Sequence, residues 1–120
     1  LLLAARLMQR TFRASDLLYR YGGEEFVAII SAENEAIARN VFERVRLAIE
    51  AHAFPRNVSM TISIGYAEVD SGILPVEVLS RADRSLYQAK QDGRNRIYDF
   101  NELVARGVFA NPTYGDAELF

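Results

Sequence analysis

Apolar residues recur at helical spacing in three stretches of the chain. They fall at steps of three and four residues over 1–12, over 35–52 and over 75–91, so that each stretch has one apolar face. Asn34 precedes the second stretch and suits a helix N-cap, and Pro75 suits the first position of the third helix. The pattern therefore predicts three amphipathic helices, the first of which reads as the later part of a helix.

Strand-forming residues occupy the stretches between these helices. Residues 16–21 and 24–30 are rich in aromatic and branched side chains, and only two glycines separate them. A two-residue Gly-Gly link indicates a β-hairpin, because tight hairpin turns need positive φ angles that glycine adopts freely. Residues 58–67 alternate apolar and polar positions and predict the clearest strand, while residues 95–100 predict a last short strand.

These elements follow the order helix, hairpin, helix, strand, helix, strand. That order indicates an α+β fold in which helices cover a sheet, and 120 residues suffice for one domain with one core. The remaining residues, 101–120, contain the stretch NPTYGD and predict an irregular C-terminal tail.

The composition excludes several classes of site. Half of the residues are hydrophobic, and a net charge of −2 gives no reason to expect nucleic acid or an anionic membrane as a partner. Without cysteine the chain has no disulfide or thiolate metal site, and the lone His52 forms neither an imidazole metal site nor a hydrolase triad. A bound metal would therefore have oxygen ligands, which favours Mg²⁺, Ca²⁺ or Mn²⁺.

An acidic pair, Glu24 and Glu25, follows the two glycines of the expected hairpin. Neighbouring residues on a strand point to opposite faces, so the two carboxylates do not simply chelate one ion together. At a glycine bend a phosphate or base can approach the backbone closely, and one carboxylate there could hold Mg²⁺ or accept a hydroxyl proton. Those roles suit phosphoryl or nucleotidyl transfer. The spacing alone also fits a solvated hairpin tip.

Two pairs of charged residues are further candidates. Lys90 and Arg94 lie four apart around Gly93, which is placed to end the third helix. They could clamp phosphates or be ordinary cations at the negative end of a helix dipole. Arg13 and Asp16 are spaced to form a local ion pair, and an arginine held by an aspartate can also present its donors to a guanine edge or a phosphate. Spacing does not decide between the two interpretations of either pair.

Three motifs together resemble one protein family. RYGGEEF resembles the signature of the GGDEF domain of bacterial diguanylate cyclases, in the Glu variant that active members also use. TISIGYA resembles a strand that these domains carry downstream, and RADRSLYQAKQDGRNRI resembles their closing helix and turn. The resemblance covers about residues 1–98, with the motifs in the family's order and spacing. It implies a domain over residues 1–100 with an antiparallel-rich, palm-like sheet flanked by helices, of the nucleotidyl cyclase type.

The resemblance also implies a reaction and the residues that perform it. Members condense two GTP molecules into cyclic di-GMP and release pyrophosphate, with Mg²⁺ or Mn²⁺ as cofactor. Two domains face each other as a homodimer, so that each 3′-hydroxyl attacks the other's α-phosphate. By position, Gly22 and Gly23 would lie against the nucleotide. Glu24 would ligate the metal and accept the proton of the 3′-hydroxyl, and Glu25 is the second signature acid, with a metal or supporting role.

Five further positions match functional positions of the family. Lys90 and Arg94 match its phosphate contacts, and their charge suits the stabilisation of transferring phosphoryl oxygens. Arg13 and Asp16 match its inhibitory motif, and Arg44 matches a position that completes this site from a partner domain. In the family, cyclic di-GMP binds there and restrains the enzyme. The resemblance thus implies a cytoplasmic signalling domain, in some members part of a membrane-anchored protein.

One part of the family pattern has no match in this chain. The family begins with a helix and a strand whose aspartate binds metal, followed by an asparagine and an aspartate that read guanine, and the chain starts after them. That strand lies in the middle of the family's sheet, so we expect exposed strand edges and no cyclase activity from a fragment limited to these residues. Two alternatives therefore remain open. One is a catalytically inactive module that binds cyclic di-GMP through Arg13 and Asp16, and the other is an inert structural or dimerisation fragment.

Overall fold

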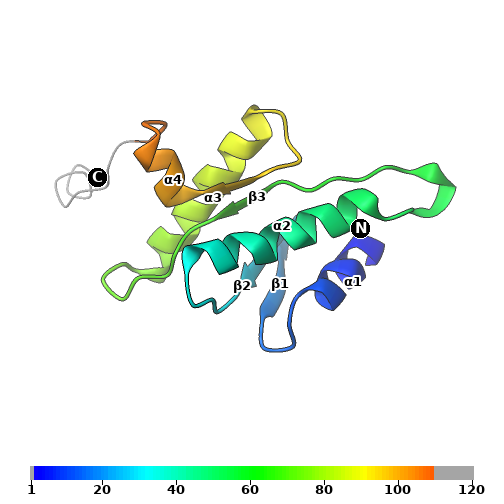
Figure 1. Cartoon of the computed structure of the whole chain (residues 1–120), viewed down its shortest axis with the longest axis horizontal. Helices are drawn as coiled ribbons and strands as arrows, with labels where there is room; N and C mark the ends of the chain where they lie inside the picture. Colours follow the sequence, from blue (N-terminus) through cyan, green and yellow to red (C-terminus); the bar gives the residue numbers. More distant parts are fainter. Residues whose placement is uncertain (1, 110–120) are drawn as a thin grey trace.

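The structure is a computed structural model that describes residues 2–109. Helices pack around short strands, and the hairpin runs behind the long second helix (Figure 1). In chain order the elements are α1 (Leu2–Thr11), β1 (Leu17–Gly22), β2 (Glu25–Ile29), α2 (Glu35–Ala51), the 3-10 helix η1 (Pro55–Asn57), β3 (Ile64–Tyr66), α3 (Pro75–Gln91), β4 (Ile97–Asp99) and α4 (Phe100–Ala105).

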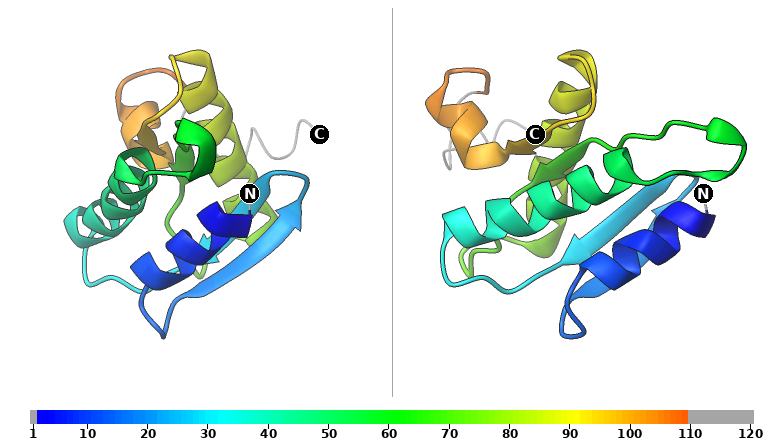
Figure 2. Two further views of the ribbon diagram at one scale, coloured as in Figure 1. Left: turned by 90° about the vertical axis from the view of Figure 1, so that its right-hand side faces the viewer. Right: turned by 45° about the vertical axis from the view of Figure 1, so that its right-hand side comes forward.

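The three predicted helices are confirmed as α1, α2 and α3, with bounds that agree to within one residue. Asn34 caps α2, since its Oδ1 accepts a hydrogen bond of 2.9 Å from the backbone N–H of Ile37. Pro75 occupies the first turn of α3, where its missing N–H costs no helical hydrogen bond. α1 packs beside α2, and α3 packs against β3 and β4 (Figure 2).

The predicted hairpin is confirmed, but its turn differs from the expected Gly-Gly link. β1 and β2 pair antiparallel, and near the tip Gly22 pairs with Glu25. The turn therefore consists of Gly23 and Glu24, and Gly23 supplies the positive φ of 53°. Tyr21 is the extra residue of a β-bulge, which shifts the register by one position. The register thus decides which of the two glycines turns the chain.

The strand predicted over residues 58–67 is wrong in extent, because only Ile64–Tyr66 forms a strand. β3 pairs in parallel with β4, so the described residues form two separate two-stranded sheets, one antiparallel and one parallel. Residues 58–63 have the alternation of a strand but no strand beside them in the part of the chain that the structure describes. A strand assignment requires a hydrogen-bonded neighbour, which alternation alone does not supply.

Two clusters of buried side chains form the core. The larger lies between α1, α2 and the inner face of the hairpin, and the smaller joins α2 to β3 and β4. Phe12 packs against both and meets the ring of Phe42 edge-on, with ring centroids 6.4 Å apart. The first cluster consists of Ala4, Met8, Val45, Ile49 and Phe54, and the second of Phe42, Tyr66 and Ile97.

Gly65 allows β3 to lie directly on α3. A methyl group at this position would stand 2.1 Å from the backbone nitrogen of Leu86 and 2.3 Å from the carbonyl oxygen of Ala82. Both atoms belong to the backbone of a helix, so neither can move aside without shifting α3. The glycine in TISIGYA therefore has a packing role.

The expectation of an irregular tail is wrong for residues 101–105, which belong to α4. Phe100 and Leu103 are each 1% exposed, so this short helix is stabilised by its contact with the core rather than by its own length. Residues 110–120, also expected to be irregular, lie outside the described residues. Among residues 2–109, no helix combines the length and the apolar character that crossing a membrane requires.

Candidate functional site

The predicted ion pair between Arg13 and Asp16 is present in the loop that joins α1 to β1. The Asp16 carboxylate accepts hydrogen bonds from the Arg13 backbone N–H at 2.9 Å and from its Nε and Nη2 at 3.3 and 3.2 Å. Nη2 also donates to the carbonyl oxygen of Ser31. The Asp16 side chain is 1% exposed, whereas that of Arg13 is 45% exposed. The aspartate therefore fixes a guanidinium that still faces solvent.

Arg44 lies on the exposed side of α2. Within residues 2–109, no hydrogen bond or ion pair joins it to Arg13 or Asp16. The three residues predicted to form one inhibitory site are thus divided, with a preformed pair in the loop and a separate arginine on the helix.

The tip of the hairpin is held by Arg20, which the sequence analysis did not single out. Its Nη2 and Nε donate to the carbonyl oxygen of Gly23 at 2.8 and 3.1 Å. Both glycines are exposed, and a methyl group added at Gly22 or Gly23 would meet no described atom within 4 Å. Gly23 is required by its positive φ, but the fold gives no reason for Gly22 to lack a side chain. The signal for Arg20 was its position three residues before Gly23.

Glu24 and Glu25 are exposed at this tip. No hydrogen bond or ion pair of their side chains occurs in the described part of the chain, and no group of three or more acidic or histidine side chains gathers there as a metal cage. Mg²⁺ is commonly bound through one or two carboxylates together with substrate phosphates. One unpartnered carboxylate beside open backbone fits such an ion.

Lys90 lies in the last turn of α3 and Arg94 just after Gly93, as predicted. Gly93 has a φ of 120° and the Arg94 backbone N–H donates to the carbonyl oxygen of Ala89 at 2.9 Å, so the helix ends in a glycine cap. Lys90 is half-buried and Arg94 is exposed. Neither contacts Glu24 or the other hairpin acid through a hydrogen bond or ion pair among the described residues. Among the described residues, no direct polar contact therefore joins the cations to the acids.

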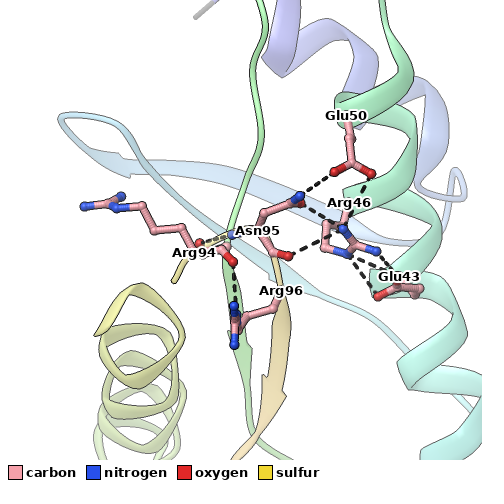
Figure 3. Close-up of polar contacts among 7 residues, drawn as sticks. Glu43, Arg46, Glu50, Arg94, Asn95 and Arg96 are labelled. Carbon is pink, nitrogen blue, oxygen red and sulfur yellow. Dashed lines mark hydrogen bonds and ion pairs between the residues drawn. The ribbon is translucent and has the colours of Figure 1, made fainter. Parts of the chain in front are cut away.

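The turn after Gly93 is fastened to α2 by a polar network that the sequence analysis missed. Asn95 is its centre, with Arg46, Glu43 and Glu50 around it (Figure 3). The hydrogen bond from Arg46 lowers the pKa of the Glu43 carboxyl, so the pair stays charged at neutral pH. Nothing in the local sequence pairs residues 49 positions apart.

A second polar group is buried where β3, β4 and α2 meet. The Tyr66 hydroxyl donates to a carboxylate oxygen of Glu35 at 2.9 Å, and Asp99 is 6% exposed. Burial raises the pKa of the Asp99 carboxyl, although backbone N–H groups of Asn101 and Glu102 act in the opposite direction. Tyr66 belongs to the smaller core cluster and Asp99 directly precedes α4, so these two buried side chains bear on stability rather than on the candidate site.

The sequence matches a family model described as "Diguanylate cyclase, GGDEF domain" over residues 1–96. It is 33% identical over 97 residues to Diguanylate cyclase A of Treponema denticola and 42% identical over 91 residues to the response regulator PleD of Caulobacter vibrioides. These matches cover 78% and 71% of this chain but 26% and 20% of the relatives. The chain thus spans about a quarter or less of their length.

The fold is similar to two solved structures. The GGDEF domain of DgcB from Caulobacter crescentus, crystallised in complex with c-di-GMP, gives a TM-score of 0.75 at 31% identity, over 82% of this chain and 61% of that chain. The active GGEEF domain of a diguanylate cyclase from Vibrio cholerae gives 0.74 at 27% identity, over 83% and 65%. These likenesses confirm the predicted α+β fold and are consistent with the nucleotidyl cyclase palm.

Proposed function

This chain belongs to the GGDEF family of diguanylate cyclases, and from that membership we propose that it is part of an enzyme that condenses two GTP molecules into cyclic di-GMP. The hairpin tip carries the proposal. There, two exposed and unpartnered carboxylates stand beside a glycine, Gly22, that the packing of the fold does not require. A relative with the same GGEEF letters is described as active, which supports the same assignment here.

The nucleotide would lie against Gly22 and Gly23, where the backbone is open to solvent. Backbone without a side chain lets phosphate oxygens approach N–H groups closely. The hydrogen bonds from Arg20 to Gly23 hold this turn in one conformation, so the surface that meets the nucleotide is already formed.

Glu24 would hold Mg²⁺ or Mn²⁺ and would accept the proton of the attacking 3′-hydroxyl, with Glu25 in a metal or supporting role. When bound, the ion supplies positive charge for the phosphoryl oxygens. In the reaction the O3′–Pα bond forms while the bond from Pα to the bridging oxygen of the β-phosphate breaks, and pyrophosphate leaves. Lys90 and Arg94 would stabilise the charge that develops on the phosphoryl oxygens.

Two such domains would face each other as a homodimer, each holding one GTP. In this arrangement each 3′-hydroxyl meets the α-phosphate of the GTP held by the other domain. Residues that act on one phosphate can then come from both domains.

The test is the incubation of the purified full-length enzyme, of which this chain is a part, with GTP and Mg²⁺, followed by separation of the nucleotides. The proposal expects cyclic di-GMP and pyrophosphate in a ratio of about one to two, as the stoichiometry of two displacements requires, and no product after chelation of the metal. Release of GDP and phosphate instead would contradict it, because that pattern is hydrolysis at the γ-phosphate.

A product-binding site at Arg13, Asp16 and Arg44 is the second candidate function, and it rests on the fixed geometry of the first two. A guanidinium held by a buried carboxylate is preorganised for a guanine edge or phosphate, and the neighbour DgcB was crystallised with c-di-GMP. Calorimetric titration with cyclic di-GMP tests this site. Arg13→Ala should abolish binding, while Arg10→Ala on the exposed face of α1 should not, and unchanged binding in Arg13→Ala would exclude the site.

A further inference from the structure

The turn that carries Arg94 has an uncommon backbone. Three successive residues have positive φ, namely Gly93 at 120°, Arg94 at 64° and Asn95 at 49°. Glycine adopts such angles freely, but for the next two residues the left-handed region is unfavourable and needs support from their surroundings.

Hydrogen bonds to α2 and to Ser63 supply that support for Asn95. Its Oδ1 accepts a hydrogen bond of 2.8 Å from Nη1 of Arg46, and its Nδ2 donates to the carboxylate of Glu50. Its backbone N–H donates to the Ser63 hydroxyl at 3.1 Å. Every one of these contacts joins the turn to a distant part of the chain, and Figure 3 shows the side chain pointing into the group on α2.

Arg46 is itself held in place. Its Nε lies 3.1 and 3.2 Å from the two carboxylate oxygens of Glu43, one helical turn away, and its side chain is only 15% exposed. A guanidinium gripped by a carboxylate on one side can offer its remaining donors in one fixed direction. The ion pair on α2 therefore holds the donors of Arg46 in position for the Asn95 amide.

Arg94 differs from its neighbour in having a fixed backbone and a free side chain. Its N–H is bonded to the end of α3, and its carbonyl oxygen accepts from Nε of Arg96 at 3.0 Å. Its guanidinium makes no hydrogen bond within residues 2–109 and points away from the network (Figure 3). Several contacts thus fix the backbone from which this exposed cation extends.

We propose that Arg46 and Asn95 are positioning residues for nucleotide binding, since they fix the backbone from which Arg94 reaches the phosphates. The inference rests on the proposed function, in which Arg94 is a phosphate contact. A side chain that extends from a fixed backbone loses less conformational freedom on binding, so its contact with the ligand is stronger.

The test compares Asn95→Gly and Arg46→Ala with Arg39→Ala in the full-length enzyme, of which this chain is a part. Glycine keeps the positive φ and removes only the amide, while Arg39 is another arginine of α2, paired with Glu102 at 2.9 Å and away from the turn. We expect the first two variants to raise KM for GTP about tenfold, the lower end of the loss seen when residues that orient metal ligands are removed, with a smaller change in kcat. Hydrogen exchange of the amides at 93–96 should become faster in these two and not in Arg39→Ala.

The same substitutions in an Arg94→Ala background decide whether the effect passes through Arg94. The inference expects Asn95→Gly to add nothing to KM once Arg94 is gone. An undiminished effect in that background would overturn it, as would a KM in Asn95→Gly equal to that of Arg39→Ala while Arg94→Ala raises KM. In the latter case the proposed function stands. If Arg94→Ala leaves KM unchanged, or the unaltered protein neither binds nor converts GTP, the phosphate role of Arg94 and the inference fall together.

Discussion

Gly22 and Gly65 are both glycines of recognised motifs, but the structure gives them opposite reasons for lacking a side chain. At Gly65 a methyl group would overlap the backbone of α3, whereas at Gly22 it would meet nothing and the backbone φ is ordinary. Packing explains the first glycine. No packing contact explains the second, so its substitution can separate an effect on folding from an effect on the proposed function.

Gly22→Ala should leave the free energy of unfolding unchanged to within about 0.5 kcal/mol, because the added methyl group faces solvent. It should nevertheless abolish GTP turnover if phosphates lie against this backbone. Denaturant unfolding and a turnover assay measure the two effects. Gly72→Ala is the matched control, since a methyl group there makes only an ordinary contact of 3.6 Å with Asp70. Full turnover in Gly22→Ala would contradict the placement of the nucleotide.

Among the elements, the helices were predictable from the sequence and the strands only in part. An amphipathic helix is defined by its own spacing and by its end signals, such as the cap of α2 at Asn34 and the glycine after α3 at Gly93, which are all local. A strand also needs a neighbour, and the residues at 58–63 have the right alternation without one in the described chain. The bulge at Tyr21 is likewise a property of the pairing, so the sequence alone assigned the turn to the wrong pair of residues.

Gly65→Ala tests the packing of β3 on α3. The substitution should lower the free energy of unfolding by about 3 kcal/mol or more, because a methyl group 2.1 Å from the helix backbone forces the two elements apart. Chemical denaturation followed by circular dichroism measures the loss. Gly107→Ala is an instructive comparison, since it has open space but a φ of 78° and should cost only about 1 kcal/mol. Equal, small losses in both variants would show that β3 does not lie this close to α3.

For the whole molecule, the sequence could not predict which distant side chains meet. The hydrogen bond from Arg46 to Asn95 spans 49 positions and that from Tyr66 to Glu35 spans 31. None of these four residues is unusual in its local sequence. The same distinction between local motifs and distant contacts applies to the candidate site. The residues of RYGGEEF and of the end of α3 could be named from their motifs. The contacts that orient the end of α3, however, arise from the packing of α2 against the turn.

The buried Asp99 predicts a pH dependence for the stability of the whole fold. Burial raises its pKa above the ordinary 3.8, so the folded state binds more protons than the unfolded state just above that pH. Stability should therefore fall as pH rises from about 3.8 through the raised pKa. Asp99→Asn should remove this fall and leave the variant more stable than the unaltered protein at neutral pH.

Asp92 serves as the comparison for Asp99, because its pKa is shifted in the opposite direction. A hydrogen bond from the Tyr98 hydroxyl, at 2.6 Å, lowers the pKa of the exposed Asp92 carboxyl, so its contribution to stability is lost as pH falls. Urea unfolding from pH 3 to pH 8 (a range of about five units around these pKa values) gives the free energy of unfolding at each pH. The slope of that free energy against pH should change in opposite directions in Asp92→Asn and Asp99→Asn. The same slope in both variants would contradict the assignment of Asp99 as a buried acid.

The most direct test is the formation of cyclic di-GMP from GTP by the full-length enzyme, of which this chain is a part, with Glu24 replaced by glutamine. Glutamine keeps the size of the side chain but can neither accept the 3′-hydroxyl proton nor supply a charged metal ligand. The account predicts that Glu24→Gln lowers turnover by at least about 100-fold, as expected for the loss of a general base, with the fold intact because Glu24 is exposed. Glu33→Gln, which alters an exposed acid between β2 and α2, should turn over GTP like the unaltered protein. Turnover of Glu24→Gln at the level of Glu33→Gln would contradict the central claim that this hairpin tip performs the chemistry.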